Sequence, residues 1–181
     1  MNLQKTEIPL SKKKMLLSLA GSLLFVLLGV WFILKPHQLS HGPLSNPILV
    51  TIVGVVSILF FGAVAIVILK KMKGNPIGLT LSSEGIIDNS SGVSSGLILW
   101  DDIVDITTTT VVNQKFVLIL TKNPESYINR QTQILKKKTM QMNYKSYGSP
   151  ICISANALQI NFEDLHQMVL EYFSKYKTVA L

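Results

Sequence analysis

The sequence predicts a two-helix transmembrane hairpin followed by an α+β domain, and three observations carry this prediction. Two long runs, residues 15–34 and 48–69, contain no charged residue. From Gly74 onward, apolar residues alternate with polar ones, as they do in half-buried strands. The chain then closes on a segment whose apolar residues recur at helical spacing. Strands followed by one amphipathic helix indicate an α+β domain.

Both uncharged runs are long enough to cross a membrane. A bilayer core of roughly 30 Å needs about 20 apolar residues in a helix that rises about 1.5 Å per residue, and the runs hold 20 and 22 residues. Hydrocarbon offers no hydrogen-bond partners, so each run is expected to be helical. Buried core helices are the alternative, but a chain of 181 residues has little protein to cover two helices that are apolar all round. The first run is also longer than the apolar part of a signal peptide.

The distribution of lysines predicts the orientation of the spans. Four lysines precede the first run and three follow the second, whereas the loop between them contains one. The excess of lysine on one side places both termini in the cytoplasm. The expected order is a cytoplasmic basic N-terminus (1–14), transmembrane helix 1 (15–34), an external loop (35–47), transmembrane helix 2 (48–69) and a cytoplasmic domain (74–181).

The net charge of +7 does not indicate a nucleic-acid-binding protein, because of where the charge lies. Residues 1–73 contain eight lysines and one acid, whereas residues 74–181 contain nine basic and nine acidic residues. The whole excess therefore flanks the predicted spans, as membrane topology requires. No nucleic-acid partner is expected.

Small residues on the first span predict close helix packing. Ser18, Ser22 and Gly29 are separated by four and seven positions, which places them on one face. Small residues allow helices to approach closely in lipid, and a packed hairpin and a homo-oligomer are equally compatible with this pattern. Neither span contains an ionisable residue, so proton or ion transport has no intramembrane group to use.

The region after the spans predicts short strands and a closing helix. A longer polar segment follows the fifth strand and is expected to be helical over 125–138. Asn161 is expected to cap the last helix, and Trp100 to be buried against that helix near Val169 or Phe173. The expected strands cover 77–81, 86–88, 97–100, 103–112, 116–120, 150–154 and 158–160, and the apolar stripe of the last helix comprises Phe162, Leu165, Val169, Tyr172, Phe173 and Tyr176.

Several of these segments resemble a known family. The turn Ser83-Glu84-Gly85, the segment Ile98-Leu99-Trp100-Asp101-Asp102-Ile103 and the terminal helix resemble bacterial PH-like domains. With two spans before them, and with the segments 123–128 and 147–151, they resemble a family of uncharacterised bacterial inner-membrane proteins. The resemblance implies a bent antiparallel β-barrel capped by the final helix, and it carries no catalytic residue. The long segment between Asn123 and Gly148 departs from a minimal PH-like domain.

No motif in the chain predicts an enzyme, a metal site or a cofactor. The D-D-x-x-D pattern at 101–105 holds magnesium in some helical isoprenoid enzymes, but here it lies between predicted strands without a second acidic motif. The serine loop at 90–96 lacks the lysine and the following helix of a P-loop. His37 and His41 lie in a Pro- and Gly-rich loop without a third ligand, and His166 has no nucleophile beside it in the sequence.

Cys152 is the single cysteine, so no intramolecular disulfide can form. It lies in the apolar run PICIS, which predicts a buried, inert thiol.

A basic segment is the remaining candidate site. No acid lies between Glu125 and Glu163, and the hypothesis is that this segment binds anionic lipid headgroups at the inner leaflet, or else a protein partner; the alternative is an ordinary solvated loop. Its cations are Arg130, Lys136, Lys137, Lys138 and Lys145, and the side chains expected to enter the headgroup layer are Tyr127, Met140, Met142, Tyr144 and Tyr147.

The sequence is compatible with two functions. The first is a membrane-anchored, PH-like binding module that presents its small domain to anionic lipid or to an unknown protein partner. The alternative is a small structural or protective membrane subunit, of an envelope-complex or immunity type, that acts through its helical hairpin.

Overall fold

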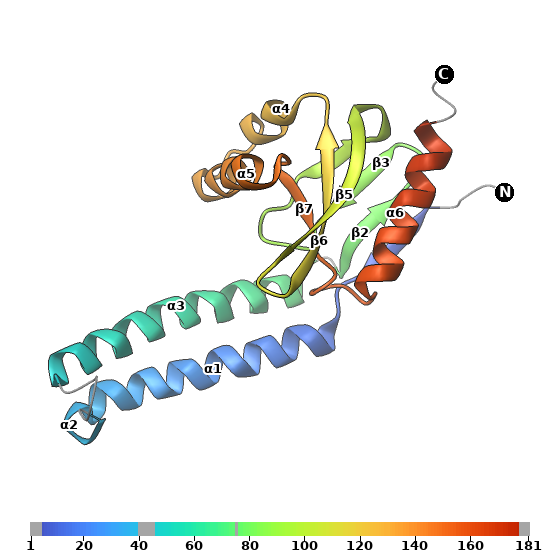
Figure 1. The fold of residues 1–181 in the computed structure, drawn as a ribbon. Coiled ribbons are helices and arrows are strands. Elements are labelled where there is room, and N and C mark those ends of the chain that lie inside the picture. Colours follow the sequence, from blue (N-terminus) through green and yellow to red (C-terminus); the bar gives the residue numbers. More distant parts are fainter. Residues whose placement is uncertain (1–4, 40–45, 75, 178–181) are drawn as a thin grey trace. The chain divides into compact units, whose positions relative to one another are not determined.

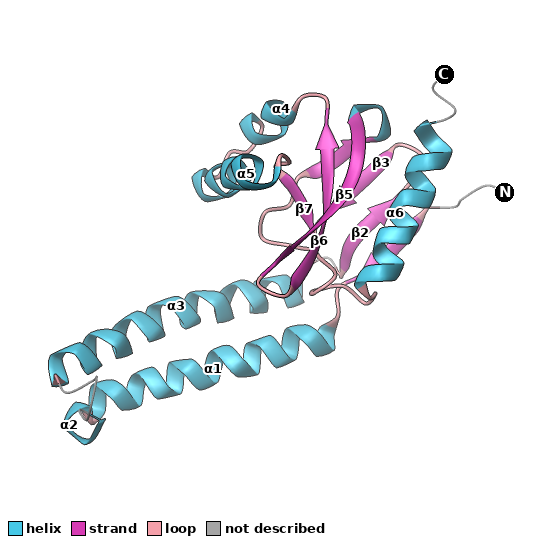
Figure 2. Ribbon diagram, viewed as in Figure 1, coloured by secondary structure: helices cyan, strands magenta, loops and turns pink. Residues whose placement is uncertain are grey.

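The computed structural model describes residues 5–39, 46–74 and 76–177, and the chain forms two compact units. One unit is helical and covers residues 12–76. The other combines the chain up to Ser11 with the chain from Ile77 onward, and it contains all the strands (Figure 1; Figure 2).

The helical unit contains two long apolar helices. Helix α1 spans Lys12–Leu34, the single turn α2 spans Pro36–Leu39, and α3 spans Pro47–Lys73. Both α1 and α3 are long and apolar enough to cross a membrane, and only a small share of either is buried, unlike the core helix of a soluble protein. The external loop predicted at 35–47, with its His41, lies partly outside the described residues.

Helices α1 and α3 pack closely at a pair of glycines. A Cβ atom added to Gly29 would lie 2.8 Å from the carbonyl oxygen of Gly54, and one added to Gly54 would lie 2.7 Å from that of Gly29. The hydroxyl of Ser57 donates to the carbonyl of Phe25 at 3.0 Å, and the ring of Phe25 stacks on Phe61 at 4.3 Å between centroids. The structure therefore contains the packed hairpin, one of the two arrangements that the small residues allowed; Ser22 and Gly29 are buried, whereas Ser18 is exposed.

The globular unit contains two open antiparallel sheets. Their orders are β1-β2-β3-β4 and β5-β6-β7. The α+β layout is confirmed, but the ladders among the described residues join the strands into two sheets and not into one closed barrel. The strands are β1 (Thr6–Pro9), β2 (Ile77–Leu81), β3 (Gly85–Asp88), β4 (Gly96–Leu99), β5 (Ile103–Val111), β6 (Gln114–Thr121) and β7 (Ile151–Ile153).

The first strand corrects the predicted domain boundary. The sequence assigned residues 1–14 to a separate basic terminus, yet Thr6–Pro9 pair with β2, with Thr6 opposite Leu81 and Pro9 opposite Ile77. Four residues are too few to show a strand period, and the partner strand lies beyond both long helices. The globular unit is therefore not a continuous 74–181 domain, because the two long helices are inserted between its first two strands.

Three other predicted elements differ in detail. Trp100 begins a short 3-10 turn, Trp100–Asp102, instead of ending a strand. The predicted strand at 158–160 is reduced to one bridge between Leu158 and Leu10. The helix predicted at 125–138 is two helices, α4 (Pro124–Asn129) and α5 (Ile134–Tyr147).

The closing helix α6 (Phe162–Lys177) forms as its pattern predicts. The side-chain oxygen of Asn161 accepts a hydrogen bond from the backbone N–H of Asp164 at 2.8 Å, so the capping residue satisfies one of the free donors at the helix start. Leu165, Val169 and Tyr172 are buried. In Figure 1 the strands lie between α6 and α5, which places the two helices on different sides of the unit.

Trp100 is buried against α6, as predicted. Its ring centroid lies 6.2 Å from that of Tyr172 and 6.5 Å from that of Phe173. Its indole N–H donates to the carbonyl of Ser82 at 2.8 Å, so the polar atom of this large side chain is satisfied inside the core.

Candidate functional site

Arg130 differs from the other predicted lipid-binding cations because its guanidinium contacts other groups of the protein. The group donates to the backbone carbonyls of Ser95 and Leu97, the latter at 2.8 Å, and it lies over the ring of Tyr127 at 4.1 Å. These contacts connect the end of α4 to the segment that leads into β4. The guanidinium of Arg130 is therefore engaged by the protein, although the residue is exposed.

Tyr127 does not lie on the surface, contrary to its expected role in a headgroup layer. The side chain is 2% exposed, and its hydroxyl donates to the carboxylate of Asp102 at 2.7 Å. Burial and the Asp102 hydrogen bond raise the pKa of Tyr127 to about 12. Met140 is fully buried as well, so the sequence placed two core residues at the surface.

Helix α5 contains the four lysines of the predicted site. It ends at a glycine that stops the helix. Gly148 has a φ of +74°, the left-handed conformation that stops a helix, and its N–H donates to the carbonyl of Tyr144 at 2.9 Å. The helix begins at Ile134 without a side-chain cap. The lysines therefore lie on a regular helix.

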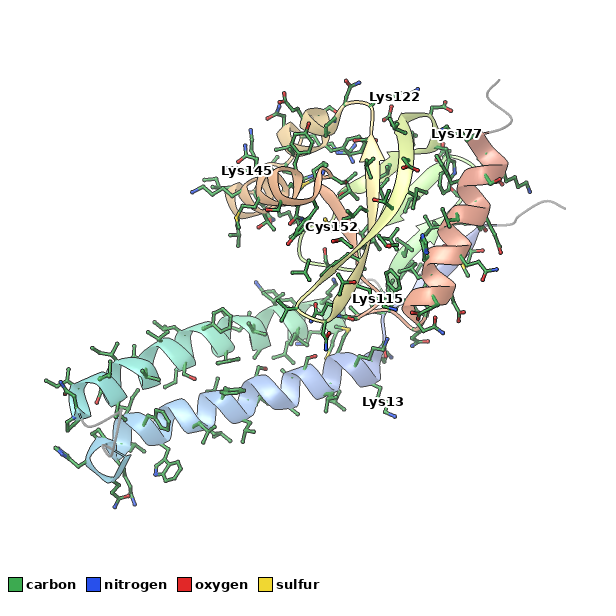
Figure 3. All side chains as sticks on the ribbon, viewed as in Figure 1. Lys13, Lys115, Lys122, Lys145, Cys152 and Lys177 are labelled. Atoms are coloured by element: carbon green, nitrogen blue, oxygen red, sulfur yellow. The ribbon has the colours of Figure 1, made fainter. Side chains whose placement is uncertain are left out.

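The outward face of α5 combines apolar and cationic side chains. Ile134, Leu135 and Met142 are 75%, 78% and 68% exposed. From Leu135 the outward positions follow intervals of three, four and three, the spacing of neighbours on one helix face. This outward face comprises Ile134, Leu135, Lys138, Met142 and Lys145, and Figure 3 shows Lys145 directed away from the strands.

Only part of the predicted cation set lies on that face. Lys138 and Lys145 are exposed on it, whereas Lys136 and Lys137 are half-buried, and Lys136 falls in the same row as Met140 and Asn143 on the inward face. The prediction missed Ile134 and Leu135, the most exposed apolar residues of the helix. Their spacing to Lys138 and Met142 would have identified them, had the helix been placed at 134–147 instead of 125–138.

The inward face of α5 borders a cavity in the globular unit. The cavity has a volume of about 240 Å³. Its helix side consists of Thr139, Asn143 and Tyr147, each four positions after the last, and its other side comes from the three strands β5, β6 and β7 and from the serine loop. Every residue that lines the cavity is partly exposed, so the cavity opens to solvent.

Cys152 on β7 borders the same cavity, and it is less buried than the sequence predicted. Its side chain is half-buried, because the cavity takes the place of packed neighbours on one side. This partial burial raises the pKa of Cys152 to about 11, with a smaller contribution from the Asp88 charge. The thiol is therefore protonated at neutral pH, as expected for an inert cysteine.

The serine loop is organised by a buried carboxylate. Asp88 accepts hydrogen bonds from both the N–H and the hydroxyl of Ser90, at 2.8 and 2.6 Å, and Ser94 donates to the carbonyl of Asp88. The loop therefore uses these polar groups on its own backbone and side chains.

The acidic pattern at 101–105 does not converge on one point. Asp102 accepts from Tyr127, whereas Asp105 accepts from the backbone N–H of Ile106 at 2.8 Å. His166 stacks on Phe162 at 6.0 Å between ring centroids. Among the described residues, no group of three acidic, histidine or cysteine side chains could hold a metal ion.

The helical unit contains a second, entirely different surface. A groove of about 430 Å³ lies between α1 and α3, bordered by Gly29 and by the rings of Phe25, Phe32, Phe60 and Phe61. Nearly all of its surface is apolar, as expected for helices that face lipid.

Comparison of the chain with protein-family models, with curated proteins and with solved structures finds no match. The arrangement of its own residues is therefore the basis for a functional conclusion.

Proposed function

We propose that this protein is a membrane-anchored binding module whose helix α5 docks on anionic lipid headgroups. The main support is the composition of the outward face of α5, where three exposed apolar side chains lie beside Lys138 and Lys145. A helix that lies in a membrane interface has this composition, because the apolar groups enter the headgroup boundary while the lysines meet anionic lipid. The stretch between Glu125 and Glu163 contains no acid to oppose that contact.

The expected interaction is weak for a free domain and effective for a tethered one. A lysine near an anionic leaflet contributes about 1 kcal/mol, which corresponds to roughly a fivefold change in affinity. The connections between the two units are short: Leu10 and Ser11 separate β1 from α1, and residues 74–76 separate α3 from β2. With α1 and α3 in the bilayer, tethering raises the effective concentration of α5 beside the lipid.

The proposed location is the cytoplasmic face of a bacterial inner membrane, with α1 and α3 as the two spans. The lysines beside the spans support this orientation. A reporter enzyme fused after Leu181 is expected to be active only in the cytoplasm. Activity of the fusion only on the outer side of the membrane would reverse the orientation and remove α5 from the inner leaflet.

A PH-like arrangement of the globular unit is part of the proposal. Among the described residues, seven strands form two antiparallel sheets and a C-terminal helix packs against the core, and this arrangement supports the proposal. Two features depart from a minimal domain: the first strand precedes the membrane helices, and α4 and α5 are inserted between β6 and β7. In this proposal, the insertion carries the binding surface.

The test uses the full chain in nanodiscs of neutral phosphatidylcholine or of anionic phosphatidylglycerol. With Cys152 changed to Ser, a Met142→Cys variant carries a polarity-sensitive fluorophore on the outward face, and a Leu170→Cys variant carries the same label on α6 as the control. We expect an apolar shift of the label at position 142 in anionic discs. The shift should decrease at about 1 M salt, where the Debye length falls to about 3 Å, and the label at position 170 should not respond.

Charge variants separate lipid binding from general electrostatics. Lys138→Gln and Lys145→Gln together should abolish most of the shift, whereas Lys122→Gln, which removes an exposed charge elsewhere in the same unit, should not. An equal response in neutral and anionic discs, or no effect of the double variant, would contradict lipid docking.

A structural or protective subunit that acts through its hairpin is the second candidate. The aromatic groove between α1 and α3 favours it, because such a groove can receive another apolar helix. If the α5 variants show no lipid response while Phe60→Ala disrupts a complex that survives extraction in mild detergent, this second function replaces the first.

A further inference from the structure

We propose that the cavity between α5 and the sheet β5-β6-β7 is a binding site for a small neutral molecule with one apolar face and one hydrogen-bonding edge. The site uses the inward face of α5, so it does not depend on lipid docking by the outward face. It also uses a cluster of side chains, Thr139, Asn143 and Tyr147, that the proposed function leaves without a role.

The size of the cavity limits its occupant. The cavity has a volume of about 240 Å³ and is open to solvent, so it is a recess in the surface of the globular unit. Ligand sites for drug-sized molecules begin near 300 Å³, so the occupant is smaller, on the scale of one substituted ring.

The helix side of the cavity is polar. Thr139, Asn143 and Tyr147 follow intervals of four, so they lie in a row along one face of α5. Thr139 donates to the carbonyl of Leu135 at 2.9 Å, whereas the side chains of Asn143 and Tyr147 form no hydrogen bond with another residue that the structure describes. An amide that can donate and accept, beside a phenol, therefore remains available to a ligand.

The opposite side of the cavity contains three apolar side chains. Val111 and Phe116 come from neighbouring strands, and Val93 comes from the loop before β4, while Ser91 and Thr109 add two hydroxyl groups. Water beside the three apolar side chains finds few hydrogen-bond partners, so its replacement by an apolar group is favourable. Among the described residues, no charged side chain lines the cavity, which selects against an ionised ligand because an unpaired charge would lose its hydration there.

The single cysteine provides a direct readout. Cys152 borders the cavity and is partly exposed, so a small alkylating reagent that enters this space can reach the thiol. Its raised pKa makes alkylation slow at neutral pH, and a pH near 9 brings the reaction into a measurable range. Because Cys152 is the only cysteine of the chain, the mass of the alkylated protein reports on this site alone.

The test uses benzamide as the probe and the full chain in neutral-lipid nanodiscs. Benzamide has an apolar ring and a neutral amide edge, whereas benzoate has the same shape with a negative charge. We expect benzamide to slow the alkylation of Cys152 by iodoacetamide at least fivefold at saturation, and to show saturation-transfer NMR contacts that empty nanodiscs do not show. Benzoate should do neither.

Two substitutions on α5 form the matched pair. Asn143→Leu removes the amide from the cavity and should weaken benzamide binding about tenfold, whereas Gln141→Leu changes the exposed side of the same helix and should leave binding unchanged. Tyr147→Phe, which removes one hydroxyl and keeps the ring, should weaken binding less than Asn143→Leu.

Absence of protection and of saturation transfer at the highest soluble benzamide concentration would overturn the proposal. Equal protection by benzoate, or equal weakening by Asn143→Leu and Gln141→Leu, would overturn it too. None of these measurements uses anionic lipid, so their failure is distinct from failure of the proposed docking function.

Discussion

Helices α5 and α6 have similar lengths, 14 and 16 residues, yet they differ in how many of their apolar side chains are buried. Helix α6 buries Leu165, Val169 and Tyr172 in one stripe. Within α5, which the structure describes throughout, Met140 is the one fully buried residue, whereas Ile134, Leu135, Met142 and Tyr144 are exposed. The difference indicates that α6 is a core element, whereas α5 covers the sheet with a partly polar face and keeps apolar residues available for a partner.

The two helices also differ in the charged and capping residues at their ends. Helix α6 begins with Glu163 and Asp164, where acids are favoured by the helix dipole, and it ends with lysines. Helix α5 has no acid and no side-chain cap at its start. The end residues of α6 therefore stabilise that helix, whereas α5 lacks such residues at its start. This difference agrees with a binding role for α5.

Removal of the Trp100 ring, which packs against α6, is expected to give the largest loss of stability. Trp100→Ala should destabilise the globular unit by about 3–5 kcal/mol, because a large buried aromatic ring and its contacts with α6 are lost. Urea unfolding of the full chain in detergent micelles, followed by hydrogen exchange over residues 77–177, measures this loss. Trp31→Ala in α1 is the control, since Trp31 is 46% exposed and belongs to the helical unit. A Trp100→Ala protein that unfolds like the parent would show that α6 does not depend on this ring.

A matched pair of leucines tests the comparison most directly. Leu165→Ala on α6 should cost about 2–5 kcal/mol, because this side chain is fully buried. Leu135→Ala on α5 should change stability by less than about 0.5 kcal/mol, because its side chain is 78% exposed, while it lowers the lipid response of the outward face. Similar losses of stability in the same urea experiment would mean that α5 is a core helix like α6.

Arg130 and Lys138 should differ although the sequence grouped them in one site. Arg130→Gln should cost about 1 kcal/mol, because hydrogen bonds from an exposed guanidinium to the carbonyls of Ser95 and Leu97 are lost. Lys138→Gln should leave stability within about 0.5 kcal/mol and should act on lipid binding instead. If urea unfolding found the two variants equally stable, the contacts of Arg130 would contribute nothing measurable to the attachment of α4.

The smallest expected effect lies at the start of α6. The ammonium group of Lys115 lies 2.7 Å from the carboxylate of Glu163, and this hydrogen bond lowers the pKa of Glu163 below its ordinary value of 4.5. A lowered folded-state pKa contributes stability above the ordinary value, and that contribution is lost as the pH falls through the lowered pKa. Lys115→Gln should move the pKa of Glu163 back toward 4.5, measured by NMR titration of labelled glutamate. An unchanged titration would exclude Lys115 as the main cause, and Lys175→Gln at the other end of α6 is the control.

The sequence supported the elements whose signals are local. Two uncharged runs predicted α1 and α3, and the apolar stripe with its capping Asn161 predicted α6, because length, periodicity and capping are properties of neighbouring residues. The burial of Trp100 followed from the same reasoning, since a large aromatic ring beside a sheet-packing helix has few other places to go.

The predicted site was only partly correct because its helix was placed too early. A helix over 125–138 put Tyr127 and Met140 near the surface and left Ile134 and Leu135 without a role. Arg130 lies between α4 and α5, where its hydrogen bonds reach the start of β4, more than thirty residues away. No local pattern indicates such a partner, because the spacing of charges along a chain does not specify which carbonyls lie beside them.

The sequence alone determined that this chain has two helices able to span a membrane, a region of short strands and one amphipathic closing helix, since each arises from hydrophobic patterns within a short window. Only the tertiary structure decided that residues 6–9 complete a sheet begun after the second long helix, and which side of α5 faces outward. It also decided that Thr139, Asn143 and Tyr147 border a cavity against three strands. The physical reason is that strand partners, burial and cavities depend on contacts between residues that are distant along the chain.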